Sequence, residues 1–412
     1  MSSTTERSEI PATLLLARSV IDDPYPFYRR LVAEAPVWRV PGTDIVIVSS
    51  YAAVHEAVSR VEDFSSNIRS ILYRGADDTP ERMAFGFAGL QTLAVADPPV
   101  HTSHRRTVFP ELVARRMAAL RPDIEALAGE RLVAALSETR FEAMETLGNA
   151  IPIRVVSQLI GFTAADPASL LAAAFDSTEM LAATQPLAEV EAAMGRTAEV
   201  TAWIGEQLQG AIERKVEGIL GVVGAAVGSG DLAFEEGLVI LQTLLSAGGE
   251  STTSLLGSAM HILARDLELQ VRLRAEPELI DPFIEEALRL ESPFRHHLRH
   301  ANRATELCGV SIPADATLLL LWGAANRDPA EYDRPDEVVL DRQTPKHHLA
   351  FGRGIHFCVG APLARLEAQC VLTELLAGTE HFALDPNRAP ERVNSLMVRR
   401  FQTLPLVATA RP

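Results

Sequence analysis

The stretch Phe351-Gly-Arg-Gly-Ile-His-Phe-Cys-Val-Gly360 is the most informative part of this sequence. Its three glycines surround Cys358 and allow the backbone to pass close to a flat ligand, with N–H groups pointing at the sulfur. Pro362 suits the first turn of a helix, so we expect a helix to begin near Cys358. Because helix N-termini lower the pKa of a thiol, Cys358 is a candidate metal-binding thiolate. The alternative is a buried structural cysteine.

The composition is that of a folded, acidic protein. Of 412 residues, 47% are hydrophobic and 22% are charged, which is enough apolar surface to offset the entropy of ordering. There are 38 basic and 54 acidic residues, and the formal net charge of −16 argues against nucleic acid or anionic membranes as partners. The three cysteines, Cys308, Cys358 and Cys370, form no CxxC pair, which argues against disulfide and four-cysteine zinc frameworks.

Neither a membrane anchor nor a signal peptide is expected. No stretch approaches 18 consecutive apolar residues, and the N-terminus lacks a basic region followed by a long apolar one. We therefore expect a cytoplasmic protein. Length alone suggests two or three domains, but no shift in composition marks a linker. We expect one domain over residues 1–412 and a monomer.

Helical patterns dominate the chain. They fill about 101–290 and 355–380, and small β regions are expected at about 35–50, as a hairpin, and 295–321. Residues 62–96 show no sustained period and are predicted to form a long irregular loop. A helix over about 235–265 is apolar nearly all round, so we expect it to be central and buried. Gly248 and Gly249 in its middle each cost about 1 kcal/mol relative to alanine and indicate a kink or a close ligand.

FGRGIHFCVG resembles the haem-binding loop of the cytochrome P450 family, FGxGxHxCxG, at every fixed position. The resemblance implies a mainly α haem-thiolate fold with a minor β portion. Haem b would lie, without covalent attachment, between the long helix and the cysteine loop. Cys358 would be the axial thiolate ligand of the iron, and His356 would contact a haem propionate. Four other loop residues would belong to the cofactor site: Phe351, Gly352, Gly354 and Gly360.

Further basic residues resemble the family's propionate contacts. Asp97-Pro-Pro-Val-His-Thr-Ser-His-Arg105 resembles its DPPxHxxxR helix, which implies that His101 and Arg105 bind a haem propionate. These two residues are four apart and share a helix face. Arg299, ten residues before Gly309, resembles the family's propionate-binding arginine on a strand. Without the resemblance, the sequence around His101 and Arg105 favours a solvated, basic first turn of a helix.

Ala247-Gly-Gly-Glu-Ser-Thr252 resembles the family's oxygen-activating segment, AGxET. The resemblance implies that Gly248 leaves room for dioxygen, and that Glu250 and Ser251 form an acid–alcohol relay for protons. Ser251 stands where most relatives have threonine, and it lacks the methyl group that limits rotation of the hydroxyl, so we expect leakier proton control. Thr252 lies about 100° round the helix. The alternative is a core helix loosened by glycine and serine.

Glu286-Ala-Leu-Arg289 resembles the family's ExxR helix, about seventy residues before Cys358. Residues three apart share a helix face, so the two side chains can pair. The resemblance implies a structural pair, and loss of one partner would leave a buried charge at a cost of about 3–5 kcal/mol. Many relatives supply a downstream arginine as a third partner. Glu337 occupies that position here, and whether Arg342 fills the role is left open.

By family position, the 62–96 loop, Leu244–Ala247, Pro293–His297 and Ser395–Val398 would line the substrate pocket. These segments are largely apolar, so a mainly apolar small molecule is expected. Arg295 or His296 could bind a polar group, or could equally face a propionate. The individual candidates are Leu244, Ala247, Pro293, Phe294, Arg295, His296, Leu396 and Met397.

His296, His297 and His300 have the composition of a zinc site. They follow a proline in a β-like stretch where their side chains need not converge, so we expect no metal there.

The resemblance implies a monooxygenase that inserts one atom of O2 into a C–H or C=C bond. The sequence has no flavin or nicotinamide motif, so we expect electrons from a ferredoxin and its NAD(P)H-dependent reductase. Arg115, Arg116 and Arg353 are candidate contacts for the ferredoxin. Two alternatives remain: a peroxide-using peroxygenase, which would not need Glu250 and Ser251, and a non-catalytic haem-thiolate sensor or binding protein.

Overall fold

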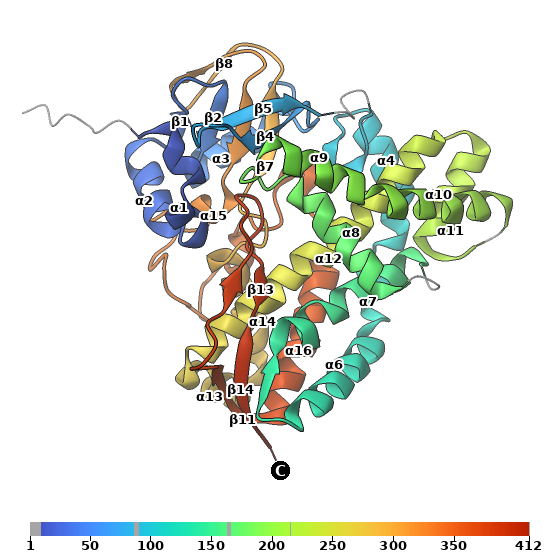
Figure 1. Cartoon of the computed structure of the whole chain (residues 1–412), viewed down its shortest axis with the longest axis vertical. Coiled ribbons are helices and arrows are strands. Elements are labelled where there is room, and N and C mark those ends of the chain that lie inside the picture. The colour runs from blue at the N-terminus through green and yellow to red at the C-terminus, as the bar shows by residue number, and fades with distance from the viewer. Residues whose placement is uncertain (1–9, 86–89, 163–165, 215, 412) are drawn as a thin grey trace, which may run out of the picture.

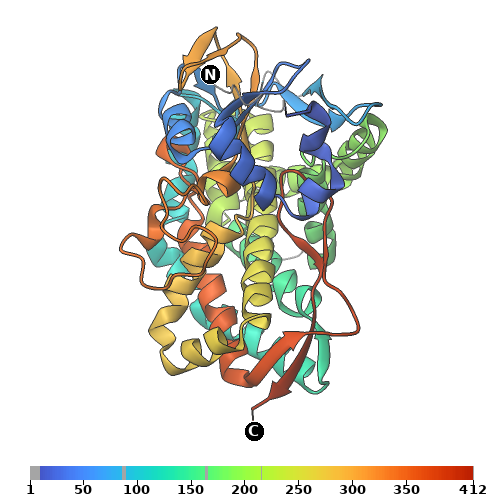
Figure 2. The same cartoon turned by 90° about the vertical axis from the view of Figure 1, so that its left-hand side faces the viewer.

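The computed structural model describes residues 10–85, 90–162, 166–214 and 216–411. Helices surround α12 (Phe234–Ala264), which runs through the middle of the molecule (Figures 1 and 2). The other helices are α1 (Arg18–Asp22), α2 (Tyr25–Glu34), α3 (Tyr51–Ser59), α4 (Val100–Val108), α5 (Ala114–Ala118), α6 (Arg121–Leu136), α7 (Ala150–Ile160), α8 (Pro167–Glu179), α9 (Leu187–Arg196), α10 (Ala198–Glu213), α11 (Gly218–Ser229), α13 (Leu267–Ala275), α14 (Ile280–Leu290), α15 (Trp322–Ala325) and α16 (Ala361–Gly378). Within the described residues, no helix is long and apolar enough to cross a membrane.

A five-stranded sheet with the order β1-β2-β10-β7-β3 lies at one end of the molecule. The predicted hairpin at 37–48 is confirmed, because β1 and β2 pair antiparallel. Strand β10 joins the sheet parallel to β2 and antiparallel to β7. The strands are β1 (Val37–Arg39), β2 (Ile45–Val48), β3 (Phe64–Ser65), β4 (Ser70–Arg74), β5 (Pro80–Ala84), β6 (Arg140–Glu142), β7 (His297–Ala301), β8 (Thr305–Leu307), β9 (Val310–Ile312), β10 (Thr317–Leu320), β11 (Thr379–Leu384), β12 (Glu391–Arg392), β13 (Phe401–Thr403) and β14 (Pro405–Ala410).

The prediction of an irregular loop over 62–96 is wrong for much of that segment. It contains β3 and the antiparallel hairpin β4–β5. Tertiary contacts stabilise the hairpin: Ile71 is fully buried, and the backbone N–H of Arg74 donates to the carbonyl of Gln185. These partners lie far away in sequence, so the local pattern carries no period that reveals them. Gly86 and Gly89, which contributed to that prediction, lie outside the described residues.

The central helix confirms the apolar pattern of residues 235–265. It is continuous from Phe234 to Ala264, and its glycine pair serves close helix packing. A Cβ atom at Gly248 would lie 2.5 Å from Cγ2 of Val156 on α7, and one at Gly249 would lie 3.2 Å from Cβ of Ala174 on α8. The two glycines therefore let α7 and α8 approach the backbone of α12. Gly248 also borders the cavity described below.

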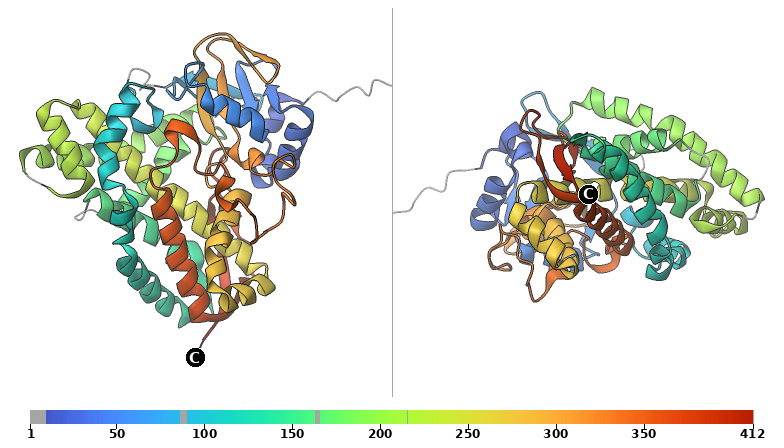
Figure 3. Two further views of the ribbon diagram at one scale, coloured as in Figure 1. Left: turned by 180° about the vertical axis from the view of Figure 1, so that it is seen from behind. Right: turned by 90° about the horizontal axis from the view of Figure 1, so that it is seen from below.

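Helix α16 begins at Ala361, three residues later than expected, so Cys358 stands just before its first turn. Figure 3 shows this helix from behind, running along the molecule. A buried ion pair holds α16 against α14. Arg365 donates from Nε and Nη2 to the two carboxylate oxygens of Glu285, at 2.6 and 2.8 Å. The ring of His348 lies 2.9 Å from the same carboxylate. Burial raises the pKa of Glu285, but hydrogen bonds from Arg365 and His348 outweigh it and set this pKa to about 2.

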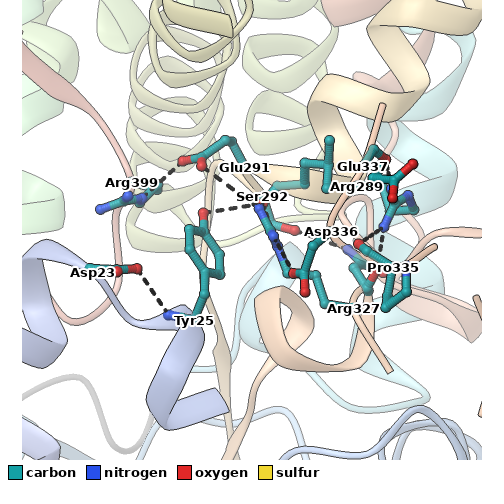
Figure 4. A network of polar contacts seen from close by, with 12 residues as sticks. Asp23, Tyr25, Arg289, Glu291, Ser292, Arg327, Pro335, Asp336, Glu337 and Arg399 are labelled. Atoms are coloured by element: carbon teal, nitrogen blue, oxygen red, sulfur yellow. Dashed lines mark hydrogen bonds and ion pairs between the residues drawn. The ribbon is translucent and has the colours of Figure 1, made fainter. Parts of the chain in front are cut away.

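The predicted Glu286–Arg289 pair is formed and fully buried on α14. Arg289 donates from Nε and Nη2 to the two oxygens of Glu286, at 2.8 and 2.9 Å. Arg342 is the third partner, and its Nε donates to Oε1 of Glu286 at 2.8 Å. Arg289 also donates to the backbone carbonyls of Pro335 and Glu337, and to that of Asn326 (Figure 4 shows the first two). The pair thus holds the chain before the cysteine loop against α14.

A second buried cluster lies beside the first and centres on Glu291 (Figure 4). Its carboxylate accepts hydrogen bonds at 3.0 Å from both Arg392 and Arg399, and Arg327 lies 3.9 Å away. Burial raises the pKa of Glu291, but these guanidinium groups outweigh it and hold this pKa well below its ordinary value. The cluster ties the end of α14 to the C-terminal segment.

Replacing Arg289 with methionine is expected to lower the free energy of unfolding by about 3–5 kcal/mol, because the Glu286 carboxylate loses its main buried partner. Denaturant unfolding followed by circular dichroism measures this loss. The control is Arg18→Met, which breaks the exposed Arg18–Asp22 pair and is expected to cost about 0.5 kcal/mol or less. A cost for Arg289→Met as small as that of the control would contradict the structural role of the pair.

Candidate active site

A cavity lies between α12 and the loop that carries Cys358. It holds about 1420 Å³ of space outside the protein atoms, part of it open to solvent. Its wall is mainly apolar, with polar groups at two places. Ser251 and Thr252 stand on the α12 side, and a group of basic side chains stands on another side. An apolar cavity with a few converging polar groups is typical of a cofactor or ligand site.

The cysteine loop folds tightly enough to bring Cys358 to the wall of this cavity. Gly352 and Gly354 have φ values of +66° and +73°, in the left-handed region that favours glycine. The N–H of Cys358 donates to the carbonyl of Phe351 at 2.9 Å and closes the loop. Phe351 in turn packs under the guanidinium of Arg365, which lies 4.5 Å from its ring centroid.

Two opposing effects act on the Cys358 thiol. Desolvation by the surrounding protein raises the pKa of the thiol, whereas the N–H groups of Gly360 and Ala361 lower it. The net direction is upward, so the protein alone favours a neutral thiol. A bound metal cation reverses this balance, because a coordinating thiol is deprotonated outright. The Cys358 sulfur therefore suits the role of a metal ligand. The backbone N–H groups of Gly360 and Ala361 would also stabilise its thiolate form.

Four of the predicted cofactor residues meet at one side of the cavity: His101, Arg105, Arg299 and His356. The rings of His101 and His356 lie 4.3 Å apart between centroids. Nε2 of His356 is buried without a hydrogen-bond partner among the described residues. Burial lowers the pKa of His356 to about 3, and the charge of Arg299 acts in the same direction. Such a group of bases fits an anionic ligand with several acceptor oxygens.

Arg105 has a contact that the sequence did not indicate. It donates from Nη1 and Nη2 to the carbonyls of Ile355 and Phe357, at 3.1 and 3.0 Å. These residues flank His356 and precede Cys358, so Arg105 braces the cysteine loop from α4. The same side chain also lines the cavity.

The residues of the cavity fit haem on three counts. Cys358 offers a sulfur with directed N–H groups, and the basic group offers donors for two carboxylates. Nε2 of His356 has no partner in the part of the chain that the structure describes. Phe351, Gly352 and Gly360 also border the cavity, as does Gly354's neighbour Arg353. Gly354 itself is not part of the described lining.

The predicted relay residues face different ways. Ser251 and Thr252 line the cavity, and Oγ of Ser251 donates to the carbonyl of Ala247 at 2.7 Å. Glu250 is fully buried outside the described lining. Its carboxylate accepts from Nε of Arg400 at 2.8 Å and from Oγ1 of Thr178 at 3.1 Å. Burial raises the pKa of Glu250, which Arg400 and Thr178 partly offset. An ion pair therefore holds the acid away from the alcohol.

The substrate-pocket candidates divide into two groups. Leu244, Ala247 and Phe294 line the cavity. The others are absent from its described lining, namely Pro293, Arg295, His296, Leu396 and Met397. Arg295 is buried and directs Nη2 to the carbonyl of Ile21 at 2.8 Å, so it packs against the N-terminal segment.

The three histidines of the apparent zinc cluster diverge. Nδ1 of His297 bonds to Trp322, Nε2 of His300 lies beside Asp315, and His296 is buried elsewhere. Across the described residues, no group of three His, Cys, Asp or Glu side chains is placed to hold a metal ion.

Two polar residues of this cavity, Trp322 and Glu367, were missed from the sequence. His297 also lines the cavity, as expected for the stretch Pro293–His297, and it shares a strand face with Arg299. Glu367 stands nine residues after Cys358 on α16, fully buried, and its Oε2 has no partner among the described residues. Burial raises the pKa of this carboxyl well above the ordinary value. No local signal marked Trp322.

The fold and the cavity define a haem-thiolate protein. The sequence pattern of the cytochrome P450 family matches residues 206–404. Cytochrome P450 144 of Mycobacterium tuberculosis is 40% identical over 388 residues, which cover 94% of this chain and 89% of that protein. The chain therefore belongs to the cytochrome P450 family, whose members are monooxygenases with a cysteine-ligated haem, and the resemblance predicted from the cysteine loop is confirmed.

Two further comparisons agree. The beta-dihydromenaquinone-9 omega-hydroxylase of Mycobacterium tuberculosis is 31% identical over 365 residues, covering 88% of this chain and 72% of that protein. The solved structure of cytochrome P450 CYP109Q5 from Chondromyces apiculatus has a TM-score of 0.82 at 29% identity, covering 96% of this chain and 98% of that chain. The predicted mainly α fold with a minor β portion is thereby confirmed.

Proposed function

We propose that this enzyme inserts one oxygen atom from O2 into a C–H or C=C bond of a mainly apolar small molecule. The observation that carries the proposal is the position of Cys358 on the wall of a cavity whose α12 side presents Ser251 and Thr252. The chain acts in this proposal as a single domain. The apolar lining supports the substrate class. One relative is by name a hydroxylase, which supports the reaction type.

Haem b is the proposed cofactor, and when bound it supplies the activation of dioxygen. Cys358 would hold its iron as a thiolate, which favours cleavage of the O–O bond. His101, Arg105, Arg299 and His356 would hold its two carboxylates through charge-assisted hydrogen bonds. The apolar wall and α12 would limit the access of water.

Proton delivery is proposed for the hydroxyls on α12. Ser251 stands at the cavity and can both donate and accept a proton. Glu250 can supply protons to this position only after its carboxylate separates from Arg400. The C-terminal segment that carries Arg400 would thus influence proton delivery.

Electrons are proposed to come from a ferredoxin and its NAD(P)H-dependent reductase. The loop that carries Cys358 reaches the surface, where the side chains of Ile355 and Phe357 are exposed. Arg353 and Arg115 are exposed near the start of the loop and on α5. Arg116 is already ion-paired with Glu111. An apolar patch with basic neighbours suits an acidic redox protein.

Replacing Cys358 with serine tests the ligand. The reduced, carbon monoxide-bound wild-type protein is expected to show a thiolate-type Soret band, and Cys358→Ser is expected to lose it because the sulfur is absent. Cys370→Ser, at a buried site on α16, is the control and should keep the band. A thiolate-type band in Cys358→Ser would contradict the assignment.

Replacing Ser251 with alanine tests the relay. Product per electron pair is expected to fall about 10²-fold while hydrogen peroxide rises, because proton delivery at the α12 side is lost. The control, Ser254→Ala, removes a buried hydroxyl of the same helix that donates to the carbonyl of Glu250. If product and peroxide yields are unchanged in Ser251→Ala, Ser251 is not the relay.

Replacing Arg353 with glutamate tests the docking face. The rate of electron transfer from an acidic ferredoxin is expected to fall about tenfold at low salt, and the difference should shrink as salt is added. Arg388→Glu, in the turn after β11, makes the same charge change elsewhere and should leave the rate unchanged. Equal rates for Arg353→Glu and wild type would argue against this face.

A further inference from the structure

His297 occupies the same side of the cavity as the basic group. It begins β7, where it pairs with Leu320 of β10, and Arg299 two residues later pairs with Leu318. Side chains two apart in a strand point to the same face, and both of these line the cavity. Both Arg299 and His297 lie close to His356. His297 therefore belongs to this group by position.

A buried tryptophan determines how His297 can hydrogen bond. Nε1 of Trp322, at the start of α15, donates to Nδ1 of His297 at 2.6 Å. Trp322 is only 2% exposed, and an indole N–H is a donor only. Because Nδ1 accepts this bond, the single proton of a neutral imidazole must sit on Nε2. The pair thus leaves His297 with one N–H to donate from its other ring nitrogen.

Desolvation, together with the charge of Arg299, lowers the pKa of His297 to about 4. This favours the neutral imidazole at physiological pH. Its contribution to the cavity is therefore a hydrogen-bond donor of fixed direction, without a positive charge. This distinguishes it from Arg299, which remains charged.

One carboxylate near this basic group already has hydrogen-bond partners of its own. Asp97 is the carboxylate whose charge acts on Arg299 and His101. However, Asp97 already accepts from the hydroxyl of Ser65 and, at 2.9 Å, from the N–H of Ser66. Arg105 and Arg299 donate to backbone carbonyls, and Nε2 of His356 has no partner among the described residues, so a ligand can supply further acceptors.

We infer that His297 is a further contact of the haem carboxylates, donating from Nε2, and that Trp322 is the positioning residue that fixes its tautomer. The inference rests on the proposed haem site and adds a donor that the cytochrome P450 motifs in this sequence do not include. A hydrogen bond to a carboxylate is stronger than one between neutral groups. The Trp322–His297 pair would thus help to retain and orient the cofactor.

Haem retention tests the inference without relying on turnover. The haem-loaded ferric protein is mixed with excess apomyoglobin, and the rate of haem transfer is followed by absorbance. His297→Phe keeps a ring of similar size and removes the N–H, and it is expected to lose haem about tenfold faster than wild type. A wild-type transfer rate in His297→Phe would overturn the inference. Wild-type protein that binds no haem would instead overturn the proposed function.

A conservative variant separates the lost hydrogen bond from lost packing. The amide of His297→Gln can accept from Trp322 through its oxygen and donate through its nitrogen. We expect it to retain haem within about threefold of wild type. If His297→Gln loses haem as fast as His297→Phe, packing explains the effect and the inference is wrong. His300→Gln, from the opposite face of β7, is the control and should match wild type.

Replacing Trp322 with phenylalanine tests the positioning role. In protein labelled with ¹⁵N-histidine and held as the ferrous carbon monoxide complex, wild-type His297 should show a protonated Nε2 and an accepting Nδ1. Trp322→Phe removes the donor, so we expect mixed tautomers and haem transfer about threefold to tenfold faster. Trp203→Phe, which packs on Phe162, is the control. An unchanged tautomer signal in Trp322→Phe would overturn the role of Trp322.

Discussion

The sulfur of Cys358 is held in a desolvated place, and this constraint organises the structure around it. The protein raises the pKa of the thiol, although two N–H groups at the start of α16 favour the thiolate. A bound iron cation is what turns this balance toward the thiolate. The cysteine loop must therefore keep the sulfur in position while the iron binds. Arg105 holds the loop from α4, and the Glu285–Arg365 pair holds α16 against α14.

The basic side chains at one side of the cavity make the local charge opposite in sign to that of the whole chain. The chain carries a formal charge of −16, yet bases gather where the haem carboxylates would lie. Burial lowers the pKa of each histidine of this group, which favours the neutral, hydrogen-bonding form and leaves the charge to the arginines. Like charges packed together would otherwise repel one another. An anionic cofactor would relieve this repulsion, which couples its binding to the stability of the region.

On the other side of the cavity, α12 combines a packing role with a chemical one. Gly248 and Gly249 admit α7 and α8 to the helix surface, while the next residues place two hydroxyls at the cavity. Glu250 comes between the glycine pair and the two hydroxyl residues in the sequence. Arg400 and Thr178 hold its carboxylate away from the cavity. The ion pair avoids an isolated buried charge and makes proton supply depend on movement of the C-terminal segment.

The sequence by itself determined the family, the central helix and the Glu286–Arg289 pair, and it singled out Cys358 as the candidate metal ligand. Each of these depends on residues close together in the chain, such as the glycine spacing around Cys358 or the i, i+3 spacing of an ion pair. Tertiary structure alone decided the partners that are distant in sequence. It brought Arg342 to Glu286, Arg400 to Glu250 and Trp322 to His297.

The difference between local spacing and contacts distant in sequence also explains the predictions that were wrong. The β4–β5 hairpin was missed because its strands are stabilised by contacts with residues far along the chain. Arg295 was expected near the substrate but packs on the N-terminal segment, since the direction of a side chain depends on what covers each face of its strand. A local sequence pattern shows only which residue types are present and how far apart they are in the chain. Only packing decides which of them meet, because burial and hydrogen bonding select among the many pairings that the spacing allows.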